Sequence, residues 1–167
     1  MTMATLRLRF VDSNDNLVAR VIRGAQMGLP WSHVEAVIPD GLYLGALIDG
    51  GVQARLPAYD SSWTRQLFVD VPATDLQLQT WSNFLGSKIG LPYDEAAIAE
   101  MAEGTLTGAA PAWDQASAYI CSALQTAALL AAGIVKSAPA GVRLATPRDV
   151  LIACGALATV GVPETRT

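Results

Sequence analysis

The sequence predicts a single α+β domain over residues 1–167, in which an antiparallel β-sheet packs against helices. Three observations support this class. The chain has 167 residues, a length that suits one domain. Its residues are 51% hydrophobic and 16% charged, against a typical charged share of about 25%, so the chain is not disordered and can form a core. Strand patterns occupy the first half and helical patterns the second, which is typical of α+β proteins.

The first half of the chain is typical of short strands and one helix. Alternating apolar and polar residues predict a strand over Thr5–Val11. Cap candidates at 12–15 precede apolar residues at helical spacing, which predicts a short helix ending within 24–30. Turn signals of the Pro-Asp-Gly and Asp-Gly-Gly type then separate strands in an antiparallel meander. The strands predicted after the helix cover residues 32–38, 42–48, 52–56 and 64–71.

The second half is typical of helices. Apolar spacing predicts a helix over Thr74–Gly86, with Thr74 or Asp75 as its cap, and a shorter helix over Tyr93–Ala102. Small residues predict a loop over Gly104–Pro111. An Ala-rich stretch predicts a helix over Asp114–Ala132, closed by Gly133, and Pro147–Ala158 predicts the last helix, with proline in its first turn.

Charge and composition limit the partners. The formal net charge is −4 and the largest basic cluster is Arg20 with Arg23, which argues against nucleic acid. Two cysteines and one histidine suit neither a disulfide framework nor a zinc site, so we expect no metal and no cofactor. The uncharged run over 116–135 is rich in Ala, Ser, Gln and Thr, so we expect a buried helix without stable membrane insertion. No targeting pattern is present at the start, which favours a cytoplasmic or phage-associated location.

A cysteine and the single histidine are the candidates for chemistry. Strand alternation puts His33 and Glu35 on one face, where a carboxylate can orient an imidazole base; the alternative is a packed or surface histidine. Cys121 lies near the start of the Ala-rich helix, where the helix dipole favours a thiolate; the alternative is a buried filler. Cys154 has apolar neighbours on both sides in the sequence, with no acid or base near it, and is interpreted as a structural residue.

The surrounding motifs strengthen the Cys-His hypothesis through a resemblance. In chain order they are Trp31-Ser32-His33-Val34-Glu35, residues 40–46 with Gly50-Gly51-Val52, Gly90-Leu91-Pro92-Tyr93-Asp94, Tyr119-Ile120-Cys121-Ser122-Ala123-Leu124, and residues 146–150. The histidine-bearing sheet precedes the cysteine-bearing helix, an order that resembles the circularly permuted papain-like hydrolases of the NlpC superfamily. The compact Gly-Gly-Val hairpin is similar to versions found in phages and prophages.

The resemblance implies a permuted papain-like fold and a cysteine hydrolase. Cys121 would be the nucleophile, and His33 would take the thiol proton and later give it to the leaving group. Backbone N–H groups near Cys121 would hold the oxyanion. The implied substrate is an amide bond in a peptidoglycan stem peptide. Two alternatives are a lipid-directed thiol hydrolase or acyltransferase, and a non-catalytic phage structural module, which the absence of the family's Glu at Ala123 favours.

The third catalytic residue is predicted from strand geometry. Glu35 shares a face with His33 and is the first candidate, with Asp49 or Gln53 as the alternatives. A turn over residues 39–42 would place Ala46 opposite Glu35, and alanine cannot orient an imidazole. The predicted site therefore depends on Glu35 itself.

Four further residues are predicted to line the substrate cleft because they belong to the matching motifs or adjoin them. They are Tyr93, Asp94, Trp31 and Ser122. Trp113 also precedes the cysteine-bearing segment and is a further candidate. Each has a structural alternative: Pro-Tyr-Asp can start a helix, and the tryptophans can belong to the core.

Overall fold

The fold was analysed in a computed structural model that describes residues 3–13, 16–26, 29–107, 117–138, 141–155 and 157–166. Within these ranges the protein is a mixed α+β structure with an antiparallel sheet, which confirms the predicted class. The strands are β1 (Met3–Ser13), β2 (His33–Val37), β3 (Tyr43–Leu47), β4 (Gly51–Arg55), β5 (Trp63–Thr74), β6 (Thr159–Val160) and β7 (Glu164–Thr165). The helices are α1 (Leu17–Ala25), the 3-10 helix η1 (Pro57–Tyr59), α2 (Asp75–Gly86), α3 (Glu95–Thr107), α4 (Cys121–Ala131) and α5 (Pro147–Gly155).

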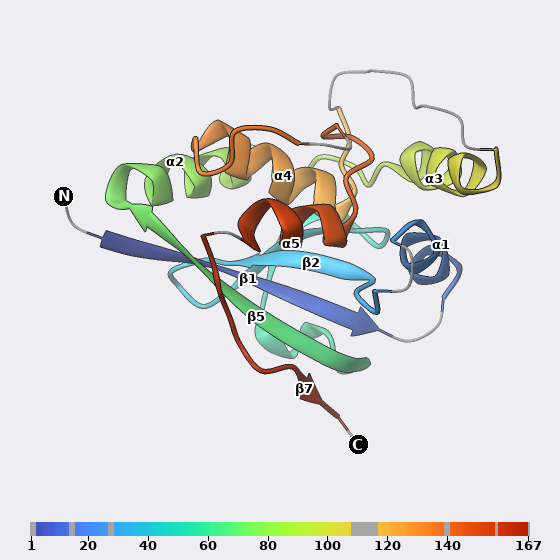
Figure 1. Ribbon diagram of the computed structural model, residues 1–167, viewed down its shortest axis with the longest axis horizontal. Helices are drawn as coiled ribbons and strands as arrows, with labels where there is room; N and C mark the ends of the chain where they lie inside the picture. The colour runs from blue at the N-terminus through green and yellow to red at the C-terminus, as the bar shows by residue number, and fades with distance from the viewer. Residues whose placement is uncertain are drawn as a thin grey trace.

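The sheet has two different faces. Its strand order is β4-β3-β2-β1-β5-β6, with β7 also paired to β5, and α2, α4 and α5 cover one face (Figure 1). Because side chains alternate along a strand, Leu6, Leu8 and Phe10 of β1 enter the hydrophobic core. Arg7 and Arg9 project from the other face, where both make ion pairs. The alternation that predicted β1 therefore also separates the core from a polar face.

The helix ends follow the predicted local signals. Thr74 caps α2 by accepting from the Gln77 N–H, and the Gln77 side chain returns a bond to the Thr74 N–H, which forms a capping box. Gly133 follows α4 with a φ of 65°, the left-handed conformation that commonly ends a helix at glycine. Both ends confirm predictions made from a few neighbouring residues.

Two helix predictions in the second half are wrong in their bounds. Helix α3 begins at Glu95 and continues to Thr107, through Gly104, where a loop was predicted; one glycine in a helix costs only about 1 kcal/mol. Helix α4 begins at Cys121, because residues 117–120 are not helical and Tyr119 forms a β-bridge instead. Residues 108–116, which complete both predictions, lie outside the described part of the chain.

The register of β2 and β3 also differs from the predicted one. Val37 pairs with Tyr43 and Ala36 with Leu44, one residue away from the predicted pairing. The chain reverses in a tight turn inside this connection, because the Ile38 N–H bonds to the Leu42 carbonyl at 3.0 Å and the Gly41 N–H bonds to the Ile38 carbonyl at 2.8 Å. Continuing this register places Gly45, rather than Ala46, opposite Glu35.

The end of the chain departs from the sequence prediction as well. Helix α5 ends at Gly155, before the predicted Ala158. The short strands β6 and β7 then add to β5, and neither was predicted, because two residues are too few for an alternation pattern. None of the described helices combines the length and the apolar character that crossing a bilayer would require.

Candidate active site

Cys121 is the first residue of α4, and an extended segment positions it. Tyr119 forms a parallel bridge with Tyr93, and the Tyr119 N–H donates to the Pro92 carbonyl at 3.1 Å. Ile120 is extended and provides no side-chain cap, so its side chain satisfies none of the free N–H groups in the first turn of α4. These N–H groups and the helix dipole favour a negative charge on the Cys121 sulfur.

His33 and Glu35 both extend from β2, and the Cys121 sulfur lies beside this strand. Helix α4 packs against β2 and β3. The backbone N–H of Val34 hydrogen-bonds to the sulfur, and the sulfur interacts with the His33 imidazole by charge and by a side-chain hydrogen bond. The fold therefore brings together a thiol and an imidazole that lie 88 residues apart in the sequence.

The protonation of this pair follows from burial and mutual charge. Burial favours the neutral imidazole, but the Cys121 charge and hydrogen bonds to Cys121 and Glu35 outweigh it and raise the pKa of His33 to about 10. Burial also favours the neutral thiol, but the His33 charge and the hydrogen bonds from His33 and Val34 outweigh it and lower the pKa of Cys121. The two groups therefore favour each other's charged forms, a thiolate on Cys121 and an imidazolium on His33.

Glu35 lies beside His33 and is buried, with 1% of its surface exposed. Its Oε2 is 3.4 Å from His33 Nε2 and accepts a hydrogen bond of 2.7 Å from the Tyr59 hydroxyl. Its Oε1 accepts a hydrogen bond of 2.7 Å from Arg9. Burial would raise the pKa of Glu35, but His33, Tyr59 and Arg9 outweigh it and lower that pKa, so Glu35 is a carboxylate.

Asp49 and Gln53, the other candidates for orienting His33, have different positions. Both side chains are exposed at the hairpin between β3 and β4. The Gln53 amide donates to the Gly50 carbonyl at 2.5 Å, and Arg55 donates to the backbone carbonyl of Asp49 at 3.1 Å. Among the three candidates, Glu35 is the one in contact with His33.

Gly45 of β3 is a site residue that the sequence analysis did not single out. A Cβ at this position would lie 3.0 Å from Glu35 Cβ and 3.3 Å from His33 Nε2, so the imidazole occupies the space beside the glycine backbone. Arg9 and Tyr59 were missed as well. An arginine in an alternating strand and a tyrosine after a proline carry no local sign of a buried carboxylate partner, so only the fold identifies them.

Tyr93 and Asp94 have separate surroundings. The Tyr93 ring lines a pocket beside His33, and burial, followed by the charges of Cys121 and Asp94, raises the pKa of its phenol. The Asp94 carboxylate caps α3 through the Ala97 N–H at 2.9 Å and forms an ion pair with Arg143 at 2.9 Å. Asp94 therefore has the structural role that Pro-Tyr-Asp at a helix start allows.

Trp31 and Ser122 are both buried. The Trp31 ring packs edge-on against Phe10, with 6.4 Å between ring centroids, and belongs to the core. The Ser122 hydroxyl has no regular hydrogen-bond partner and contributes least to the lowered pKa of Cys121. Trp113 lies outside the described residues.

The pocket beside His33 is small and partly open. Its volume is about 60 Å³, space for roughly two water molecules, and Cys121 is 1% exposed. Helix α1 forms one wall of this pocket through four side chains, and the opposite wall comes from β2, β3 and Tyr93. The lining residues of α1 are Asn16, which caps it, Val18, Ala19 and Ile22. Cys121 is not among the described residues that line this pocket, and it adjoins the pocket through its contact with His33.

We predict that weakening the start of α1 exposes Cys121. Asn16 accepts a 2.8 Å hydrogen bond from the Ala19 N–H, and Asn16→Ala should weaken the helix by about 1 kcal/mol. The open population, and with it the alkylation rate of Cys121, should rise about fivefold. Thr74→Ala removes the equivalent cap of α2, away from the pocket, and should leave that rate unchanged. An equal increase in both variants would indicate general loosening and contradict the role of α1.

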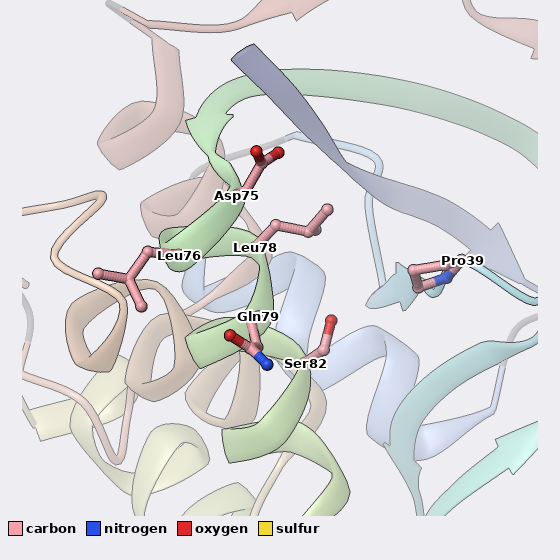
Figure 2. A pocket seen from close by; sticks show the side chains of 6 residues that line it. All are labelled: Pro39, Asp75, Leu76, Leu78, Gln79 and Ser82. Atoms are coloured by element: carbon pink, nitrogen blue, oxygen red, sulfur yellow. The ribbon is translucent and has the colours of Figure 1, made fainter. Parts of the chain in front are cut away.

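A larger surface pocket lies away from this pair (Figure 2). Its volume is about 470 Å³, and it lies between α2 and the turn after β2. Pro39 lines it from the turn, and Asp75, Leu76, Leu78, Gln79 and Ser82 line it from α2. The described residues that line it include no cysteine, histidine or lysine.

A scan against protein-family models and a search of curated proteins both found no match to this chain. The chemistry of the site therefore rests on its own geometry. A thiol of lowered pKa at a helix N-terminus, an imidazole in contact with it, and a buried carboxylate beside the imidazole are the groups that nucleophilic catalysis by cysteine uses.

Proposed function

We propose that this protein is a cysteine hydrolase that cleaves an amide or ester bond through an acyl-enzyme, with a permuted papain-like arrangement of its sheet and cysteine-bearing helix. The observation that carries the proposal is the contact between Cys121 and His33, with the thiol pKa lowered and the imidazole pKa raised. Perturbed pairs of this kind concentrate at functional sites. Glu35 supports the proposal by placing a carboxylate against the imidazole.

The proposed reaction has two halves. In the first, the Cys121 thiolate attacks the carbonyl carbon and a C–S bond forms, while N–H groups at the start of α4 stabilise the oxyanion. The C–N or C–O bond then breaks as the His33 imidazolium gives its proton to the leaving group. In the second half, neutral His33 takes a proton from water, whose oxygen attacks the thioester. The C–S bond breaks, the carboxylic acid leaves, and the thiolate and imidazolium are restored.

Two substrate classes follow from different observations. The resemblance of the motifs favours an amide of a peptidoglycan stem peptide. The pocket beside His33 favours an apolar acyl group, because its lining includes Val18, Ile22, Leu47 and Ile48 and, among the described residues, no Asp, Glu, Lys or Arg. Apolar lining with a few polar groups is typical of sites for apolar ligands. We therefore propose the lipid-directed acyl hydrolase as the second candidate function.

The test is hydrolysis by purified protein of peptidoglycan fragments and of p-nitrophenyl esters with acyl chains of increasing length. We expect Cys121→Ala to reduce turnover by at least about 10³-fold and Cys154→Ala to leave it unchanged. Faster turnover of longer acyl esters would favour the lipid-directed candidate, and cleavage of the peptide fragments would favour the peptidoglycan one. Equal rates for Cys121→Ala and the unmodified protein would contradict the proposal. Absence of turnover on every substrate would favour the non-catalytic structural module.

A further inference from the structure

A buried polar cluster lies on the face of the sheet that carries Arg9. The Arg9 side chain is 1% exposed, and a buried guanidinium is costly unless it is paired. It donates to Glu35 at 2.7 Å and to the Gln66 side chain at 2.8 Å. Its guanidinium carbon also lies 4.9 Å from the centroid of the Tyr43 ring and 5.9 Å from that of Trp63. These contacts hold the guanidinium, and through it the Glu35 carboxylate, in one orientation.

The two oxygens of Glu35 are consequently distinct. Arg9 holds Oε1, so the carboxylate cannot rotate without losing this bond. The other oxygen, Oε2, has two neighbours: the Tyr59 hydroxyl at 2.7 Å and His33 Nε2 at 3.4 Å. Burial, with the charge of Glu35, raises the pKa of the Tyr59 phenol, so this hydroxyl keeps its proton and remains a donor. Tyr59 therefore makes the short bond to Oε2 and His33 the long one.

Because Tyr59 and His33 contact the same oxygen of Glu35, the Tyr59 hydroxyl affects how strongly His33 holds its proton. A hydrogen bond donated to a carboxylate stabilises its negative charge and reduces the attraction that it exerts on another cation. An imidazolium held too strongly would be a poor acid toward the leaving group, because acid catalysis is most efficient with a pKa near the working pH. The hydroxyl of Tyr59 weakens the attraction of Glu35 for the imidazolium and so opposes an excessive rise in the pKa of His33.

We propose that Tyr59 is a positioning residue of this site. Its hydroxyl binds the same oxygen of Glu35, Oε2, that His33 contacts, and it thereby limits how far Glu35 stabilises the positive charge of the imidazolium. The consequence for proton release to the leaving group rests on the proposed hydrolase function. The coupling of Tyr59 to His33 through Glu35 does not, and it can be measured without any substrate.

The chain contains one histidine, so the titration of the His33 Cε1–H signal by NMR reports a single group. Cys121→Ala serves as the background, because it removes the thiolate next to the imidazole. In this background, Tyr59→Phe should raise the pKa of His33 by about 0.5 to 1, the effect of removing one hydrogen bond from its carboxylate partner. An unchanged or lower pKa would overturn the proposal.

Two further variants in the same background test whether the effect passes through Glu35. Glu35→Gln should lower the pKa of His33, and adding Tyr59→Phe to it should have no further effect. Tyr119→Phe removes a phenol hydroxyl that no bond joins to Glu35, and it should leave the pKa of His33 unchanged. If Tyr59→Phe raised the pKa equally with and without Glu35, the coupling would bypass the carboxylate and the proposal would fail.

With Cys121 present, the reaction supplies a second readout. Tyr59→Phe should lower kcat with KM unchanged, because Tyr59 does not line the pocket beside His33 and affects proton transfer rather than binding. A rise in KM with kcat unchanged would contradict the role of Tyr59. If the protein hydrolyses none of the substrates, the proposed function fails, whereas the NMR titration still decides whether Tyr59 tunes His33. The two failures are therefore distinguishable.

Discussion

Cys121 should react with iodoacetamide at neutral pH at least about 10²-fold faster than Cys154 in the same folded sample. Both cysteines are buried, so access does not explain the difference. The pKa of Cys121 is lowered, chiefly by His33 acting against burial, whereas burial raises the pKa of Cys154 to about 12. Only about one Cys154 side chain in 10⁵ is then a thiolate at pH 7. The lower intrinsic nucleophilicity of a low-pKa thiolate offsets part of this advantage.

The pH dependence of the two alkylation rates distinguishes the cysteines more clearly than a single rate at neutral pH does. The rate at Cys121 should reach its plateau at a lower pH than the rate of an ordinary thiol does, because the pKa of Cys121 is lowered. The rate at Cys154 should increase tenfold per pH unit up to its pKa of about 12. His33→Ala removes the strongest influence that opposes burial, so the pKa of Cys121 should rise and its rate at pH 7 should fall at least about 10²-fold.

Mass spectrometry of the two cysteine-containing peptides measures both rates in one experiment. Cys154 is the internal control, since both cysteines experience the same unfolding and reagent concentration. If Cys121 is as unreactive as Cys154, or if His33→Ala leaves its rate unchanged, the pair is not an activated nucleophile and the hydrolase proposal fails.

Gly45→Ala should reduce both hydrolysis and Cys121 alkylation by up to about 10²-fold, the loss that a misplacement of roughly 1 Å causes. The added Cβ would lie 3.0 Å from Glu35 Cβ and 3.3 Å from His33 Nε2, both tighter than most real Cβ contacts, so a neighbour must move. The Glu35 Cβ is held by the backbone of a paired strand, so we expect the more flexible imidazole to be displaced. Gly45 has no positive φ, so the effect is a steric one rather than backbone strain.

Gly86→Ala is the matched control for this substitution. Gly86 is exposed at the end of α2, and a Cβ there has nothing within 4 Å. It should leave the reactivity of Cys121 unchanged, and thermal unfolding of both variants separates local displacement from loss of stability. Normal Cys121 reactivity in folded Gly45→Ala would show that the imidazole does not need the space that the glycine leaves.

The local parts of this fold were predictable because their causes lie within a few residues. The alternation of β1 separates core residues such as Leu8 from Arg9, and Thr74 with Gln77 contains the whole capping box of α2. The shared face of His33 and Glu35 follows from the period of a strand alone, and the two side chains are in contact. These features do not depend on the rest of the chain.

The predicted helix bounds and strand register were wrong where contacts with distant segments outweigh the local conformational preference of the residues. Residues 117–120 have helical composition, but the bridge between Tyr119 and Tyr93 makes this segment extended, which brings Cys121 to the first turn of α4. The register of β2 and β3 depends on the closure of a five-residue connection, which turn signals alone did not specify. A single-residue change of register moved Gly45 opposite Glu35.

The sequence by itself determined the α+β class, the polar and apolar faces of β1, and a candidate pair of cysteine and histidine, because these depend on local periodicity and residue chemistry. The tertiary structure alone decided that Cys121 contacts His33, that Arg9 and Tyr59 bind different oxygens of Glu35, and that α1 lines the pocket beside His33. The physical reason is that charge, burial and hydrogen bonding act over a few ångströms in space. Residues far apart along the chain acquire these properties only when the fold brings them together.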